Sequence, residues 1–296
     1  MSNAKCVSVL FCLYMFAGEV KSQPREREPG GYETAGSNKP VAEITFELKD
    51  NLIYLPVSVN GSAMLNFILD GGSSFCMVDS AAAEKLQLTG AGDGLVHGAG
   101  SGAVKVKYLD SLIYGLAGTS TRVGRSDIVN LAGAVPGQKV DGLLGYEFFL
   151  KYVIEIDYPR RVLRLFQPEN YRYMGRGSVI PLIFHKKLVY FMGQIKLSGR
   201  PYVKKEYLID TGSSDVIDDE MLKESRGTKK EVVGGVGLGQ KFTIVEAKVE
   251  GFKIGNFSLK NLDGVSGDDK IGAGLLSRYT VIFDYARSRM ILEFTQ

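Results

Sequence analysis

Two aspartates of this 296-residue chain lie in nearly identical short segments. Asp70 lies within ILDGGSS at residues 68–74, and Asp210 lies within LIDTGSS at residues 208–214. An apolar run followed by Gly and Ser predicts a buried strand that leads into a tight turn, so each carboxylate should lie where a strand leaves the core. Two carboxyl groups brought close together cannot both ionise cheaply, and they share a proton instead. Such a pair can act on a bound water, with the charged carboxylate as base and the protonated one as acid.

The positions of these segments predict a duplicated chain. Asp210 follows Asp70 by 210 − 70 = 140 residues, which is the length of one small domain. A strand and a tight turn precede each aspartate, and a short helix, a glycine-rich hairpin and a closing hairpin follow it. The alternating strand patterns and the 36 glycines, clustered in turns, indicate a strand-rich fold. We therefore predict an all-β fold with short helices, made of two similar lobes at residues 41–175 and 176–296, with an active-site cleft between them.

The N-terminal segment has the pattern of a secretory signal peptide. Lys5 precedes an apolar stretch at residues 6–17, and the small residues Val20 and Ser22 follow it. The apolar stretch is short for a membrane span, so we expect residues 1–22 to be a signal peptide, with an uncleaved anchor as the alternative. Residues 23–40 mix charges with Pro and Gly and predict a flexible linker. The sequence therefore predicts an exported protein, periplasmic or secreted, with no stable membrane span after signal removal.

The composition favours neither a cofactor nor a nucleic acid. A formal charge of +3 is too small to indicate nucleic-acid binding, and the glycine-rich loops lack the lysine and the strand-to-helix context of a phosphate-binding loop. Two histidines in the whole chain provide no metal-ligand cluster. Cys76 is the one cysteine left after signal removal, and we expect it to be a buried, inert thiol. We therefore expect no metal and no cofactor.

The motifs, taken together, resemble the aspartic peptidases, in particular bacterial retropepsin-like domains, here in tandem. The resemblance covers residues 41–296 and rests on the two aspartate segments, the glycine-rich hairpins and GLLG at residues 142–145. It implies two retropepsin-like β-barrel lobes that pair within one monomeric chain. It also implies an aspartic endopeptidase, which hydrolyses a peptide or protein substrate with a water activated between Asp70 and Asp210.

The resemblance also assigns supporting residues. The loops that support the carboxyl pair are Gly71, Gly72, Ser73, Thr211, Gly212 and Ser213, and the substrate-binding flaps are His97, Gly98, Ala99, Gly100, Gly235, Val236 and Gly237.

The sequence departs from the family pattern at two places. Gly71 stands where the family has Thr or Ser, whose hydroxyl braces the pair by a hydrogen bond worth about 0.5–1.5 kcal/mol. Counted back from Asp284, residues 270–272 (Lys-Ile-Gly) take the place of residues 143–145 (Leu-Leu-Gly), although Gly-Leu-Leu occurs again at residues 274–276. Two alternatives therefore stay open, because fold and activity can separate. One is a catalytically inactive peptide-binding or interaction protein on the same fold, and the other is a dimer in which only one lobe of each chain is competent.

Overall fold

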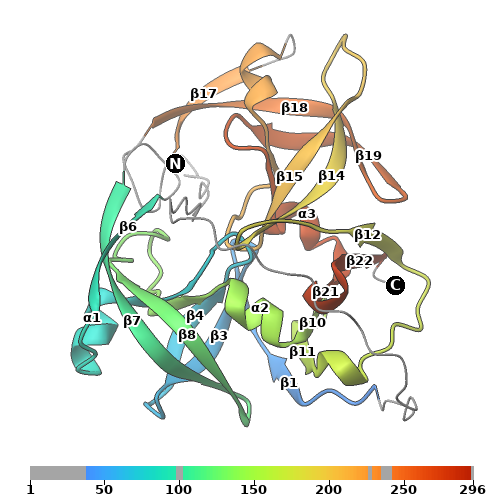
Figure 1. Ribbon diagram of the computed structural model, residues 1–296. Coiled ribbons are helices and arrows are strands. Elements are labelled where there is room, and N and C mark those ends of the chain that lie inside the picture. Colours follow the sequence, from blue (N-terminus) through green and yellow to red (C-terminus); the bar gives the residue numbers. More distant parts are fainter. Residues whose placement is uncertain (1–37, 98–102, 226–228, 235–241, 295–296) are drawn as a thin grey trace.

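The computed structural model describes residues 38–97, 103–225, 229–234 and 242–294. The predicted signal peptide and residues 23–37 of the predicted linker lie outside the described residues. In the ranges described, no helix combines the length and the apolar character needed to cross a membrane. The fold is all-β, with two lobes whose strands occupy separate parts of Figure 1.

The first lobe is an eight-stranded sheet in the order β2-β3-β4-β9-β5-β8-β7-β6. Its strand β3 reads LIYLPVSV and is buried along most of its length, as expected of an apolar strand in a sheet core. Asn60 and Gly61 follow it with φ of 51° and 78°, the left-handed conformations that a tight hairpin turn requires. The strands of this sheet are β2 (Glu47–Lys49), β3 (Leu52–Val59), β4 (Leu65–Leu69), β9 (Gly142–Leu144), β5 (Cys76–Asp79), β8 (Thr119–Val129), β7 (Ala103–Leu116) and β6 (Gly92–His97).

The second lobe repeats this arrangement strand for strand. Its sheet has the order β13-β14-β15-β20-β16-β19-β18-β17, and its extra pairing of β14 with β18 matches that of β3 with β7. The predicted likeness of the two lobes is therefore present in the order of their strands as well as in their motifs. The strands are β13 (Ile183–His185), β14 (Leu188–Lys196), β15 (Val203–Asp210), β20 (Lys270–Gly272), β16 (Ile217–Asp218), β19 (Phe257–Val265), β18 (Phe242–Ile254) and β17 (Lys229–Gly234).

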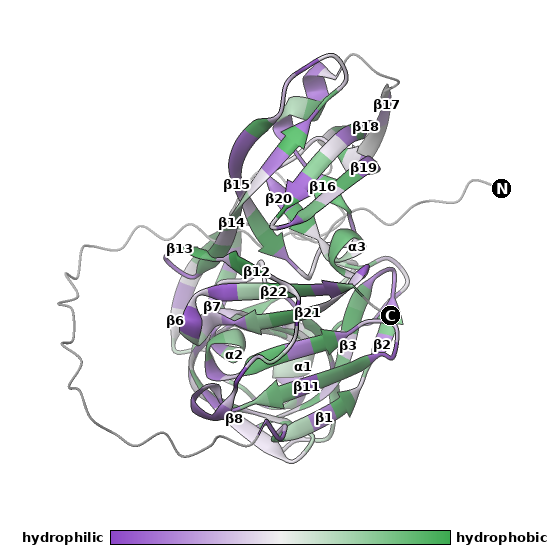
Figure 2. Cartoon of the chain, turned by 90° about the vertical axis from the view of Figure 1, so that its right-hand side faces the viewer, coloured by the Kyte–Doolittle hydropathy of each residue, from purple (hydrophilic) through white to green (hydrophobic). Residues whose placement is uncertain are grey.

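A third sheet joins the lobes. The two predicted closing hairpins pair with each other, because β10 of the first half runs antiparallel to β21 of the second, with Ile156 opposite Val281. Figure 2 shows β12, β22 and β21 running across the middle of the molecule, beneath the strands of the second lobe. The order of the shared sheet is β1 (Ala42–Thr45), β11 (Val162–Phe166), β10 (Val153–Asp157), β21 (Tyr279–Asp284), β22 (Arg289–Phe294) and β12 (Ser178–Pro181).

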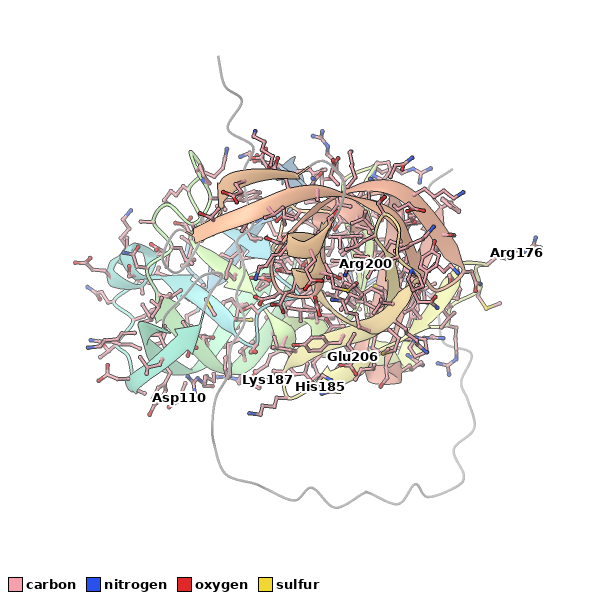
Figure 3. The ribbon with its side chains drawn as sticks, turned by 90° about the horizontal axis from the view of Figure 1, so that it is seen from above. Asp110, Arg176, His185, Lys187, Arg200 and Glu206 are labelled. Atoms are coloured by element: carbon pink, nitrogen blue, oxygen red, sulfur yellow. The ribbon has the colours of Figure 1, made fainter. Side chains whose placement is uncertain are left out.

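Aromatic rings and polar contacts also join the halves. Phe149 packs on Phe283 and Tyr285, with ring centroids 5.4 Å apart in both pairs. Lys187, in the turn between β13 and β14, donates to Glu147 of the first lobe at 2.7 Å, and this lysine is labelled at the edge of Figure 3. Backbone pairing, ring packing and an ion pair therefore fix the positions of the lobes relative to each other.

The helices are short, as predicted. Asp79 caps the helix after β5, because its side chain accepts from the backbone N–H groups of Ala81 and Ala82. The short helix after the second aspartate turn is a 3₁₀ helix that begins at Glu220, since Asp218 pairs in β16. The helices are α1 (Ser80–Lys85), α2 (Tyr146–Lys151), α3 (Ala273–Leu276) and the 3₁₀ helices η1 (Pro168–Asn170), η2 (Glu220–Glu224) and η3 (Tyr285–Arg287).

The alternating segment at residues 42–48 is divided between two sheets. Phe46 separates β1, which belongs to the shared sheet, from β2, which belongs to the first lobe. Phe46 itself is buried against Tyr158, with the ring centroids 6.2 Å apart. An alternating pattern gives the inward face of a strand, but it cannot show where the chain passes from one sheet to another.

Candidate active site

Equivalent strands deliver Asp70 and Asp210 to the junction of the lobes. β4 runs parallel to β9 with Leu69 opposite Leu144, and β15 runs parallel to β20 with Ile209 opposite Ile271. These apolar strand ends are buried, so the aspartate that follows each of them emerges from packed core. Both carboxylates are fully buried as well, with 0% of either residue exposed.

The two aspartate turns pack against each other's carboxyl group. Within each turn a backbone N–H donates to an aspartate Oδ1 at 3.0 Å, from Gly72 to Asp70 and from Gly212 to Asp210. A Cβ added at Gly212 would lie 2.5 Å from Cγ of Asp70, and one added at Gly72 would lie 2.7 Å from Oδ1 of Asp210. Only glycine permits this approach of backbone to carboxylate. The structure therefore brings together the two aspartates that the sequence singled out.

Thr211 braces the turns across the lobe interface. Its hydroxyl donates to the backbone carbonyl of Leu69 at 2.7 Å and accepts from the backbone N–H of Gly71 at 2.8 Å. The first turn cannot return this pair of hydrogen bonds, because Gly71 has no side chain. The brace is therefore one-sided, as the sequence comparison of the two turns indicated.

Gly71→Ser should stabilise the protein by about 0.5–1.5 kcal/mol relative to Gly71→Ala, the value of one added hydrogen bond. A Cβ at position 71 would lie 3.3 Å from the carbonyl oxygen of Ile209, so a hydroxyl on it has an acceptor nearby. Both variants carry the same Cβ, which also meets Phe149 at 3.6 Å, so their difference isolates the hydroxyl. Urea unfolding measures it, and equal midpoints for the two variants would contradict the prediction.

The remaining predicted site residues are placed less completely. Ser73 and Ser213 close the two turns through backbone N–H groups that donate to the carbonyls of Asp70 and Asp210, at 3.3 and 3.2 Å. His97 is the last residue of β6, where it lies opposite Ala103 of β7. The other predicted flap residues lie outside the described residues, although the strands on either side of them are present in both lobes; they are Gly98, Ala99, Gly100, Gly235, Val236 and Gly237.

Lys270 is a site residue that the sequence analysis did not identify. It is 1% exposed, and its Nζ lies 3.2 Å from Oδ2 of Asp210 and 3.3 Å from Oδ2 of Asp218. The strand pairing settles the uncertain register, because β20 is Lys270–Gly272, whereas Gly274–Leu276 belongs to α3. Lys270 therefore stands where the first lobe has Leu143. A lysine at an otherwise apolar strand position was the signal that could have identified it.

The buried charges set the proton distribution of the pair. Burial raises the pKa of Asp70 well above its ordinary value, and the negative charge of Asp210 raises it further. Burial also raises the pKa of Asp210, but Lys270 opposes this by its charge and by its hydrogen bond. Asp70 Oδ2 is buried and receives no hydrogen bond from donors in the described part of the chain. The two carboxyl groups therefore lie in unequal surroundings, since Lys270 contacts Asp210.

Metal and thiol chemistry find no support in these residues. The described ranges hold no group of three or more His, Cys, Asp or Glu side chains able to bind a metal ion. Cys76 is fully buried, as predicted, and burial raises the pKa of its thiol to about 12, which disfavours the reactive thiolate.

A comparison with known families gives independent support for the first lobe. No curated protein matches the chain. Residues 55–148 match the model of the aspartyl protease family. The matched segment runs from β3 into α2 and contains Asp70 with its turn. Sequence and topology therefore both support an aspartyl protease domain at residues 55–148.

Proposed function

We propose that this protein is an aspartic endopeptidase that hydrolyses peptide bonds with a water activated between Asp70 and Asp210. The observation that carries the proposal is the meeting of two buried carboxyl groups from equivalent turns, each packed against the glycine of the other turn. Carboxyl pairs of this kind share a proton and can act as acid and base in one step. The match of residues 55–148 to the aspartyl protease family supports the same activity.

The contact of Lys270 with Asp210 favours Asp210 as the base and Asp70 as the acid. Asp210, whose negative charge Lys270 stabilises, takes a proton from the water as its oxygen attacks the carbonyl carbon of the peptide. Asp70 donates its proton to the carbonyl oxygen, which gives a neutral tetrahedral intermediate. Collapse of that intermediate returns a proton to Asp70 as the carbonyl forms again, and Asp210 gives its proton to the departing amine. No bond between enzyme and substrate forms at any step.

The second half of the chain belongs to the proposal as a second aspartic-peptidase-like lobe. Its support is the identical strand order of the two eight-stranded sheets and the DTG turn at Asp210. Residues 41–175 and 176–296 would then form a tandem retropepsin-like enzyme of the bacterial kind, acting as a monomer on a peptide or protein substrate. Export to the periplasm or the medium is part of the same proposal and rests on the signal-like pattern of residues 1–22.

A second candidate is a peptide-binding protein on the same fold that does not cut its ligand. The observation that favours it is the one-sided brace, in which Thr211 contributes two hydrogen bonds and Gly71 contributes no side chain. A looser first turn would let the carboxyl pair bind a peptide without holding water in the attacking position, since catalysis needs closer positioning than binding does.

Incubation of the purified protein with a mixed peptide library, from acidic to neutral pH, tests the two candidates. Cleavage that a transition-state-mimic inhibitor of aspartic peptidases blocks is the expected result. Peptides that are retained on the protein but never cut would favour the second candidate. If the protein neither binds nor cleaves any peptide at any pH, both candidate functions are contradicted.

A further inference from the structure

The environment of Lys270 differs from that of the matching position in the first lobe. In the first lobe Leu143 lies opposite Met77 across the sheet, and both side chains are buried and apolar. In the second lobe Lys270 lies opposite Asp218, and the two form a buried ion pair. The two sheets share one strand order. Buried apolar side chains in the lobe of Asp70 therefore give way to a buried ion pair in the lobe of Asp210.

A buried ammonium group is costly unless carboxylates surround it. Asp210 and Asp218 lie 3.2 and 3.3 Å from Lys270 Nζ, and Asp215 adds a third negative charge. Together they raise the pKa of Lys270 above its ordinary value in spite of burial. Lys270 therefore stays charged over the whole range in which the carboxyl pair titrates.

We propose that Lys270 is a positioning residue that holds Asp210 as the charged member of the carboxyl pair and so leaves the shared proton on Asp70. The proposal rests on the proposed function and adds how that site distributes its proton. Lys270 contacts Asp210 directly and contacts no atom of Asp70 within ion-pair distance among the described residues. It therefore favours ionisation of Asp210 more than that of Asp70, and it widens the pH range in which the pair carries one proton, chiefly on the acid side.

Other titratable groups near the carboxyl pair also affect its ionisation. Asp215 and Asp218 follow the second aspartate turn, and the charge of Glu246 in β18 also acts on Asp215. Tyr285 of η3 faces Asp70, and burial raises the pKa of its phenol above the ordinary value, so it stays neutral. Among these described neighbours, Lys270 is the cation that acts on both members of the pair, and the other charged groups are acids.

Lys270→Met should shift the acid limb of the pH profile of kcat/KM to higher pH, on the order of one pH unit, and should shift the alkaline limb less. At a pH on the acid limb, such a shift is about a tenfold loss of kcat/KM. If Lys270→Met does not fold, the double variant Lys270→Leu with Asp218→Met replaces the ion pair by the apolar pair of the first lobe and should fold, because such exchanges are often neutral or stabilising. The matched control is Lys248→Met, which removes an exposed lysine 2.6 Å from Asp263 and should leave both limbs in place.

Titration of the free protein with ¹³C-labelled aspartate separates this inference from the proposed function. The first ionisation of the carboxyl pair should move to higher pH in Lys270→Met, whether or not the protein cuts any peptide. An unchanged first ionisation, or an equal change in Lys248→Met, would overturn the inference while leaving the proposed peptidase intact. A protein that shows the shift but never cleaves would refute the proposed function alone.

Discussion

Asp210→Asn is expected to lower peptide hydrolysis by about 10²–10⁴-fold or more, the contribution of a positioned acid or base. The amide cannot take a proton from water at any pH. Asp70→Asn should cause a loss of the same size, because the neutral amide cannot give its proton to the carbonyl oxygen. The measurement is kcat/KM on one cleaved peptide across the full pH profile, since a simple pKa change would restore activity at another pH.

The two variants should differ in stability, which shows whether a loss of activity is caused by unfolding. Burial raises the pKa of Asp70 above the ordinary value of 3.8, so the folded protein holds this proton more tightly than the unfolded chain does. The resulting stability is complete below the unfolded pKa and is lost as the pH rises through the folded one. Asp70→Asn avoids that loss and should melt above the wild type at neutral pH. Asp210→Asn removes a partner of buried Lys270 and should melt below it.

Wild-type cleavage by folded Asp210→Asn, or by both folded variants, would refute the assignment of the pair. Full activity in Asp70→Asn with none in Asp210→Asn would instead favour the dimer alternative, in which one turn from each of two chains completes the site. The mass of the protein in solution then decides between a monomer and a dimer.

Gly212→Ala is expected to remove activity almost as completely, although it adds only a methyl group. The added Cβ would lie 2.5 Å from Cγ of Asp70, a distance that no relaxed structure tolerates, so the two turns must move apart. Overpacking of this kind costs typically about 1–3 kcal/mol, and misplacement of reacting groups by about 1 Å can cost 10²-fold in rate. We expect both a lower melting temperature and a loss of cleavage, measured on the same preparation.

Gly124→Ala is the matched control for this substitution. Gly124 lies in β8, outside the left-handed region, and the nearest atom to an added Cβ is an oxygen of Glu147 at 4.0 Å. It should leave stability and cleavage close to the wild type. Activity that survives in Gly212→Ala would mean that the two turns need not pack this closely for catalysis.

The all-β fold with two similar lobes and the meeting of the aspartates could be predicted because local signals repeat. Each aspartate follows a short apolar strand and precedes a Gly-Ser turn, and these features depend only on neighbours in sequence. The duplication put the two turns at equivalent places in similar lobes. The resemblance to the aspartic peptidases then implied that the two lobes bring these turns together. The same comparison correctly indicated the one-sided brace at Gly71.

The remaining features depend on partners far apart in the chain. Ile156 and Val281 show why the shared sheet was missed: each lies in a strand whose pattern is satisfied equally well by its own hairpin. The role of Lys270 was missed because it depends on contacts with Asp210 and Asp218, which lie 60 and 52 residues before it in the sequence. The role of a buried lysine in an apolar strand can be assigned only when its carboxylate partners are known.

The fusion of two similar lobes into one chain has a genetic consequence. In a dimer of identical subunits every substitution appears in both halves of the site, so a lysine beneath one aspartate would bring a second lysine beneath the other. Here Lys270 and Gly71 each occur in one half only. The equivalent residues of the other half are Leu143 and Thr211. A single reading frame has thus allowed the two halves to diverge, one to carry charge and the other to carry a proton.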